Sequence, residues 1–122
     1  MKPKEIDLGF KINEEKVMAL DLPVEEMLIA DLMNNAETCY LEKEGTDDWN
    51  LSPSELIQNF DKETTHARRV EGVDLSFPIV IYYFRDQWII LDGVHRFTKA
   101  LIQKSPTIKV KKLPESLLSI IK

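Results

Sequence analysis

The residues best suited to chemistry form one short run, Asp92-Gly93-Val94-His95-Arg96. An apolar, β-prone stretch ends at Asp92, and apolar residues recur at helical spacing from Val94 onward, so we expect a strand-to-helix turn here. The first N–H groups of a helix lack partners within it and carry partial positive charge, so a phosphate or carboxylate is the natural occupant of such a turn. The sequence therefore predicts an anion-binding site at this turn.

Each residue of the run suits a particular role in holding an anion. Gly93 has no Cβ, so the backbone at Gly93 and Val94 can approach a ligand closely. Arg96 lies in the first helical turn, where the helix dipole disfavours a cation; a bound anion would remove this conflict, and the guanidinium would grip two of its oxygens. His95 supplies a donor or an acid–base group near neutral pH, and Asp92 could hold Mg²⁺ or a ribose hydroxyl. The alternative is an ordinary turn followed by solvated helix residues.

Similarity to a known family begins at Trp88 and runs through Arg96, continuing with Phe97-Thr98-Lys99-Ala100 and the segment Thr107 to Lys112. This pattern resembles the ParB/sulfiredoxin superfamily, over about Pro78 to Leu113. The resemblance implies a ParB/sulfiredoxin-like domain that binds a nucleotide with its phosphates at this turn.

The turn itself separates the branches of that superfamily. Sulfiredoxins carry Gly-Cys-His-Arg, but Val94 stands at the position of their nucleophilic cysteine, which argues against sulfinic acid reduction. ParB partition proteins carry a glycine followed by an acid and two arginines, a pattern that only Gly93 and Arg96 fit. Free serine kinases carry Asp-Gly-His-His-Arg, and every residue of that motif except its first histidine has a match here. The resemblance implies nucleotide phosphate binding and leaves the chemistry open.

A second basic cluster, Thr65-His66-Ala67-Arg68-Arg69, precedes Gly72. One interpretation is that these cations complement the dipole in the last turns of a helix. The other is that His66, Arg68 or Arg69 form the opposite wall of the phosphate pocket, where the two histidines of the chain would meet.

A catalytic carboxylate, which phosphoryl transfer requires, would have to come from another segment, and the loop from Glu42 to Asp48 is acidic. Asp47 and Asp48 are our first choices for a Mg²⁺ ligand or a general base. The alternative is that this loop is solvated and inert. We expect the neighbouring Trp49 to anchor the loop in the core rather than to stack on a base.

The elements that must position these residues belong to a chain of 122 residues, 43% apolar and 30% charged, which suits one domain spanning residues 1–122. Cys39 is the only cysteine, so an internal disulfide and a four-cysteine zinc site are excluded. The longest apolar run, Ile79 to Phe84, is too short to span a membrane. The first residues lack the apolar stretch of a signal peptide, and we expect a cytosolic protein.

The C-terminal half has the clearer pattern of secondary structure. We predict a hairpin of Ile79–Phe84 and Trp88–Leu91, a helix over Val94–Lys104 and a strand over Thr107–Lys112, with the last two strands joined by a parallel crossover. Earlier segments are predicted in sequence as follows: a strand over Ile6–Ile12, a helix from Pro23 to Asn35, a strand over Thr38–Lys43, a helix from Pro53 to Asn59 capped by Ser52, and a helix over Thr65–Glu71. A short helix follows Pro114. The fold class is a mixed α/β or α+β single domain with a small mixed sheet.

Charge is unevenly distributed along the chain. The net charge is −5, but residues 96–122 hold seven cations and one acid, whereas residues 1–95 hold nine cations and 20 acids. This distribution suits a local anion site better than an extended nucleic-acid surface. The alternative is that most of these lysines keep a helix and an edge strand soluble.

We therefore expect a domain that binds a nucleotide, ATP or CTP, or a related small phosphorylated compound, with Mg²⁺ as cofactor. If it is an enzyme, phosphoryl transfer or phosphodiester hydrolysis is the expected reaction. The alternative is a non-catalytic module in which a nucleotide controls association with a protein or DNA partner. The net charge disfavours simple DNA binding, and no membrane partner or oligomeric state is predicted.

Overall fold

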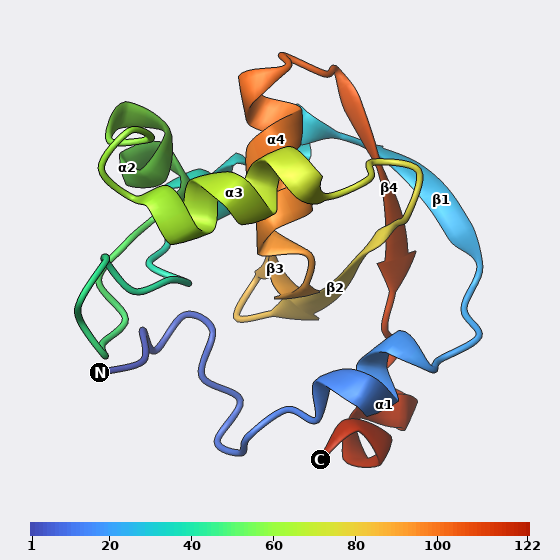
Figure 1. Cartoon of the computed structure of the whole chain (residues 1–122). Coiled ribbons are helices and arrows are strands. Elements are labelled where there is room, and N and C mark those ends of the chain that lie inside the picture. Colours follow the sequence, from blue (N-terminus) through green and yellow to red (C-terminus); the bar gives the residue numbers. More distant parts are fainter.

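The computed structural model describes all residues from 1 to 122. It contains one four-stranded sheet with helices on both faces (Figure 1). The strands are β1 (Val24–Leu28), β2 (Ile79–Phe84), β3 (Gln87–Asp92) and β4 (Thr107–Lys112). The α-helices are α1 (Glu14–Met18), α2 (Pro53–Gln58), α3 (Thr64–Gly72) and α4 (Val94–Ile102), and the 3₁₀ helices are η1 (Ile29–Glu37) and η2 (Glu115–Ile121). The mixed α+β class and the four C-terminal elements from β2 to β4 are as predicted.

The order of strands in the sheet is β1-β4-β2-β3. β2 pairs in parallel with β4 and antiparallel with β3, so β3 and β4 run in opposite directions and are not neighbours. The predicted parallel crossover between these two strands is therefore wrong. The two-residue turn Arg85-Asp86, with φ of 51° and 64°, closes the hairpin and places β3 at the sheet edge, so β4 pairs on the other side of β2.

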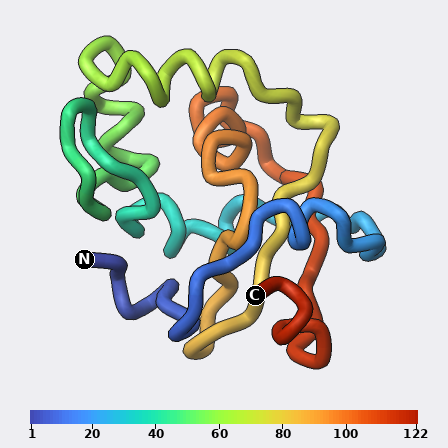
Figure 2. Tube along the Cα trace, turned by 60° about the horizontal axis from the view of Figure 1, so that its bottom comes forward, coloured from blue at the N-terminus to red at the C-terminus, as the bar shows by residue number.

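β2 is buried on both faces, and its side chains alternate between two apolar clusters. Ile79 and Ile81 belong to a cluster of ten buried residues that includes Phe97 of α4. Val80 and Tyr82 belong to a cluster of seven on the opposite face, beneath α1, η2 and the N-terminal segment. Figure 2 shows that segment, in blue, crossing the sheet near the red C-terminal helix. The sheet thus has α4 packed on one face and the two ends of the chain packed on the other.

The helix predicted from Pro23 to Asn35 is wrong. Its first part is strand β1, which pairs antiparallel with β4, and its second part is the 3₁₀ helix η1. Val24 and Leu28, which the helical spacing placed on a buried face, are 53% and 54% exposed. The local sequence prefers neither helix nor strand strongly, so the backbone pairing with β4 decides that this segment is a strand.

Two strands predicted in the N-terminal half do not form. The segment Ile6–Ile12 makes only local turns, although Ile6 itself is buried against the sheet. Within Thr38–Lys43 only Leu41 makes a bridge, to Leu51. The helices predicted near Pro53 and Thr65 are confirmed, the first with the Ser52 cap in place.

The basic C-terminal strand is matched by an acidic one. Glu26 of β1 lies opposite Lys109 of β4, and Lys112 Nζ is 3.4 Å from Glu25 Oε1. These lysines therefore belong to the sheet surface, but β4 is not the edge strand that the simpler interpretation of the charge distribution expected, because β1 pairs with it on the side away from β2. No helix combines the length and the apolar composition that a membrane crossing needs.

Candidate functional site

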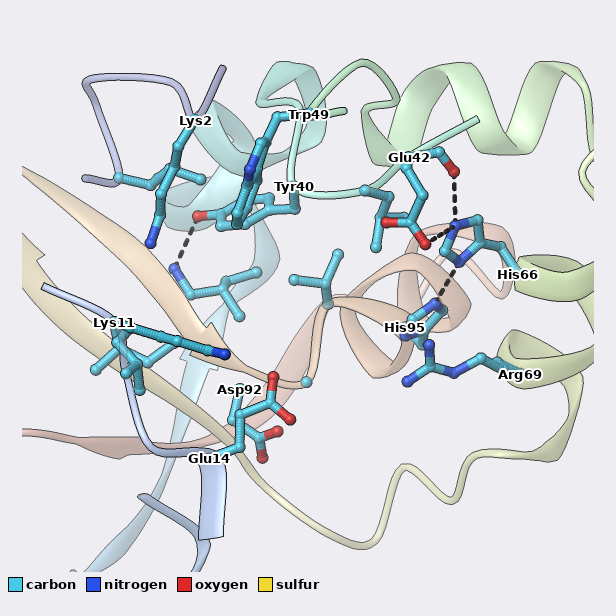
Figure 3. A pocket seen from close by; sticks show the side chains of 17 residues that line it. Lys2, Lys11, Glu14, Tyr40, Glu42, Trp49, His66, Arg69, Asp92 and His95 are labelled. Carbon is cyan, nitrogen blue, oxygen red and sulfur yellow. Dashed lines mark hydrogen bonds and ion pairs between the residues drawn. The ribbon is translucent and has the colours of Figure 1, made fainter. Parts of the chain in front are cut away.

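A cleft of about 410 Å³ lies where the N-terminal segment, α3 and the start of α4 meet (Figure 3). The predicted turn contributes four lining residues, Asp92, Gly93, Val94 and His95. α3 contributes His66 and Arg69, and the remaining walls come from the N-terminal segment, β3 and the loop before α2. The volume is in the range typical of small-molecule sites.

The lining combines balanced charge with an apolar wall. Three cations, Lys2, Lys11 and Arg69, face three carboxylates, Glu14, Glu42 and Asp92. The apolar and aromatic lining consists of Ile6, Ile12, Tyr40, Leu41, Trp49, Ile90, Leu91 and Val94. Such a cleft suits a ligand that has a charged end and a planar or apolar end.

The two histidines of the chain meet in this cleft, as one interpretation of the second basic cluster predicted. Nδ1 of His66 lies 2.9 Å from Nε2 of His95, and the two rings stack with their centroids 5.2 Å apart. His66 is buried, and its Nε2 lies 2.8 Å from the carbonyl oxygen of Glu42. Both nitrogens of the buried ring are thus satisfied.

This chain of hydrogen bonds fixes the protons on the two neutral rings. The carbonyl oxygen of Glu42 can only accept, so Nε2 of His66 is the donor to it. Neutral His66 then accepts at Nδ1, and His95 donates from its Nε2–H. The lone pair of neutral His95 is therefore on Nδ1.

The surroundings of His95 keep its ring neutral. Burial, the charge of Arg69 and the proximity of His66, in that order, lower the pKa of His95 from its ordinary value to about 4. Figure 3 shows the guanidinium of Arg69 beside the ring of His95. At neutral pH His95 is thus a base without a proton on Nδ1, next to a permanent cation.

The loop that carries Glu42 is fastened to the start of α3 by reciprocal bonds. The N–H of Glu44 donates to the buried Glu63 carboxylate at 2.9 Å. In return, the hydroxyl and the N–H of Thr65 donate to Glu44, at 2.9 and 3.2 Å. These bonds hold the Glu42 carbonyl over His66 and so position the histidine pair.

Arg96 has internal partners and does not line the cleft. Its guanidinium donates to the Pro78 carbonyl at 2.7 Å and to Asp92 Oδ2 at 3.0 Å, and both side chains of the ion pair are less than 20% exposed. The conflict between Arg96 and the dipole of α4 is thus relieved by the Asp92 carboxylate, which is part of the protein. The expected guanidinium grip on a ligand finds no support in this geometry.

Gly93 is also required by the fold. It has φ of 101°, and a Cβ added there would lie 2.6 Å from Cγ2 of Ile79. The close approach we predicted is made to strand β2 beneath the turn. The start of α4 nevertheless stays available, because Gly93 gives no side-chain cap and the first bond of the helix is donated by Phe97. The N–H groups of the preceding three residues remain free.

Three of the other predicted residues lie away from the cleft lining. Arg68 is exposed on α3, one residue from Arg69. Asp47 and Asp48 are exposed in their loop, and Asp48 pairs with the amino group of Met1. The prediction for Trp49 is wrong: its ring is 39% exposed, lines the cleft, and has Lys2 Nζ 5.1 Å from its centroid.

Sequence reasoning missed the contribution of the N-terminal segment. Lys2, Lys11 and Glu14 line the cleft but belong to a stretch with no functional motif, and its one regular pattern, over Ile6–Ile12, predicted a strand that does not form. Only the position of this segment across the sheet brings them to the site. Tyr40 was also missed; burial raises the pKa of its phenol, which accepts from the Ile90 N–H at 2.9 Å and supports the strand beside the cleft.

The protein contains no group of three or more His, Cys, Asp and Glu side chains arranged to hold a metal ion. Two carboxylates, those of Asp92 and Glu14, do line the cleft (Figure 3). Such a pair suits Mg²⁺ that also binds substrate phosphates, because Mg²⁺ commonly takes only one or two protein carboxylates.

No protein-family model, curated protein or solved structure matches this chain.

Proposed function

We propose that the cleft binds a nucleotide or a related small phosphorylated compound. The observation that carries this proposal is that Arg69, His95 and the free N–H groups at the start of α4 border the same cleft. A guanidinium and a helix N-terminus are both preferred partners of phosphate oxygens. The phosphate group is therefore assigned to this end of the cleft, with Arg69 taking the role that the sequence suggested for Arg96.

The opposite part of the cleft suits the rest of a nucleotide. Trp49 offers a partly exposed aromatic ring on which a base can stack if it displaces Lys2 Nζ, which lies 5.1 Å from the ring centroid. Apolar side chains of the N-terminal segment and β3 also line the cleft. Lys2 and Lys11 supply cations for further phosphates. ATP and CTP are the ligands we propose first, in keeping with the resemblance to the ParB/sulfiredoxin superfamily.

Mg²⁺ belongs to this proposal on electrostatic grounds. The three carboxylates of the lining are already matched by three cations, so a phosphate chain gives the cleft a net negative charge and its oxygens repel the carboxylates. Asp92 and Glu14 would hold a Mg²⁺ ion that arrives with the phosphates, and the ion would offset this repulsion and polarise the phosphoryl group. The cytosol, the expected compartment, would supply the nucleotide.

The reaction we propose is phosphoryl transfer or phosphodiester hydrolysis. The neutral imidazole of His95 supports it, because a base without its proton stands beside the proposed phosphate position. Binding without turnover would instead favour the non-catalytic module that associates with a protein or DNA partner.

Thermal unfolding with ATP, CTP and ADP, each with and without Mg²⁺, tests the binding proposal. A ligand at a hundred times its dissociation constant adds about 2.7 kcal/mol of stability, which raises the Tm of a domain of this size by roughly 10 °C. We expect Arg69→Ala to lose this shift and Arg68→Ala, its exposed neighbour, to keep it. A full shift in Arg69→Ala would overturn the assignment.

A further inference from the structure

His95 offers an unprotonated nitrogen to the cleft. Nδ1 has no hydrogen-bond partner, and no buried side-chain nitrogen or oxygen of the protein lacks one, so this atom is accessible to solvent. His95 lines the cleft, and the Arg69 guanidinium lies beside it (Figure 3). A neutral imidazole nitrogen that faces a bound phosphoryl group can attack it as a nucleophile.

We propose that His95 takes a phosphoryl group from the bound ligand onto Nδ1, so that the protein forms a phosphohistidine. This inference rests on the proposed function, since it takes the ligand to be a phosphate ester or anhydride with its terminal phosphate at Arg69. It goes beyond that function by naming a covalent intermediate and the atom that carries it.

The first step balances without an added oxidant or reductant. The Nδ1 lone pair of His95 forms an N–P bond while the P–O bond to the leaving group breaks, and the leaving oxygen keeps the electron pair of that bond. The imidazole ring becomes positively charged, and its Nε2–H proton can pass to Nδ1 of His66 along the 2.9 Å hydrogen bond. Arg69 and the N-terminus of α4 stabilise the charge on the phosphoryl oxygens.

Glu42 completes this arrangement as the counter-charge for His66. Its carboxylate Oε1 lies 3.7 Å from His66 Nε2, beyond the carbonyl oxygen that fixes the ring. When His66 takes the proton it becomes an imidazolium, and this carboxylate is the opposite charge that lies beside it. His66 is thus a positioning residue: it holds His95 with Nδ1 free and accepts the displaced proton.

Water or another hydroxyl compound completes the turnover. Its oxygen forms a bond to phosphorus as the N–P bond breaks, and the electron pair of that bond returns to Nδ1 of His95. The attacking oxygen loses its proton to solvent, and the proton on His66 returns to Nε2 of His95. The product is inorganic phosphate when water attacks and a new phosphate ester when an alcohol attacks.

The test is incubation of the full chain with [γ-³²P]ATP and Mg²⁺, with [³²P]acetyl phosphate as a second donor, followed by a rapid alkaline quench. We expect a protein label that is stable in base and lost in acid, and mass spectrometry of peptides should place it on His95. His95→Asn should reduce the label to background, whereas Arg68→Ala should retain it. A label on another residue, or one that survives in His95→Asn, would overturn the inference.

Thermal shifts measured on the same samples separate this inference from the proposed function. A shift with ATP but no label from either donor refutes the phosphohistidine and leaves nucleotide binding intact. If neither a thermal shift nor a label is observed, both the phosphohistidine and nucleotide binding are refuted.

The role of His66 has a separate readout. His66→Asn keeps an acceptor oxygen near the position of Nδ1 but cannot take up a proton, whereas His66→Ala removes both functions. We expect the rate of labelling to fall on the order of 100-fold in His66→Ala and by less in His66→Asn, with the ATP-induced shift retained in each. Equal rates in these two variants would contradict the positioning role, and the label mapped on the unaltered chain does not depend on how well they fold.

Discussion

Arg96, in the first turn of α4, and Arg69, in the last turn of α3, are both arginines of helices that border the cleft. Arg96 belongs to the motif that the sequence favours, yet its guanidinium is held by Asp92 and the Pro78 carbonyl. Arg69 belongs to the less specific cluster, yet it lines the cleft beside His95. The two arginines differ in whether the protein itself supplies a carboxylate as partner. Asp92 lies four residues before Arg96 and pairs with it, whereas Arg69 has no ion pair.

The same two helices also differ in a glycine at one end, Gly93 before α4 and Gly72 at the end of α3. Substitution of these glycines gives the largest expected change in stability. Gly93→Ala should destabilise the protein by about 3 kcal/mol, because a left-handed backbone and a contact with Ile79 both oppose a Cβ. Gly72, at the end of α3, has open space around it and no positive φ, so Gly72→Ala should stabilise by about 0.5 kcal/mol. Urea denaturation measures both. Comparable stabilities of the two variants would show that the turn is not fixed by packing on β2.

The two arginines should differ next, in the free energy of unfolding. Arg96→Ala leaves a half-buried carboxylate and a backbone carbonyl without their donor, and we expect a loss of about 2 kcal/mol. Arg69→Ala removes an exposed side chain with no ion pair, and its stability should change by no more than about 0.5 kcal/mol. Urea denaturation without ligand separates the variants, and a larger loss for Arg69→Ala would reverse the roles assigned to the two arginines.

The part of the site that could be predicted from sequence is the part built by local rules. Ser52 and Glu55 fix the start of α2, and the hairpin and α4 follow from β-prone runs, a turn and helical spacing. The meeting of His66 and His95 is predicted by one of the two interpretations of the second basic cluster, the one that places it on the opposite wall of the pocket. Its form, a hydrogen bond from ring to ring, depends on how α3 packs on α4 and was not encoded in either segment alone.

What could not be predicted depends on partners that are distant in the chain. The segment Val24–Leu28 has helical spacing of apolar residues, but β4, which begins 79 residues after β1 ends, supplies the pairing that makes it a strand. Lys11 and Glu14 reach the cleft because Ile6 and Val17 pack on the far face of the sheet. Trp49 stays at the surface because its loop lies beside the cleft instead of packing into the core.

His95 gives a pH dependence that distinguishes it from an ordinary surface histidine. The pKa of His95 is lowered to about 4 in the folded state, below its value near 6.5 in the unfolded chain, so the unfolded state binds more protons between these values. This contribution to stability is complete above about pH 6.5 and is lost as the pH falls toward 4. The causes of the lowered pKa of His95 are its burial and the neighbouring Arg69 and His66. Glu42 lies on the far side of His66.

Thermal melts at pH 7 and pH 4.5 measure this contribution. We expect the Tm of the unaltered protein to fall by roughly 5 °C more than that of His95→Gln, which cannot take up the proton; this is about half of what the full shift in pKa would give, because solvent screens the partly exposed ring. Carboxylates that titrate in the same range contribute equally to both proteins. Identical falls in the two would mean that His95 is protonated as readily in the folded protein as in the unfolded chain.

The smallest effects on the rate of labelling are expected for substitutions in the acidic loop. Glu42 lines the cleft, whereas Asp47 lies away from it. The Glu42 carboxylate is 54% exposed and 3.7 Å from His66, so Glu42→Gln should slow labelling of His95 only about two- to fivefold. Asp47→Asn should leave the rate and the ATP-induced shift unchanged, because Asp47 does not line the cleft. A larger loss in Asp47→Asn than in Glu42→Gln would restore Asp47 as the catalytic carboxylate and would show that the loop moves over the cleft when the ligand binds.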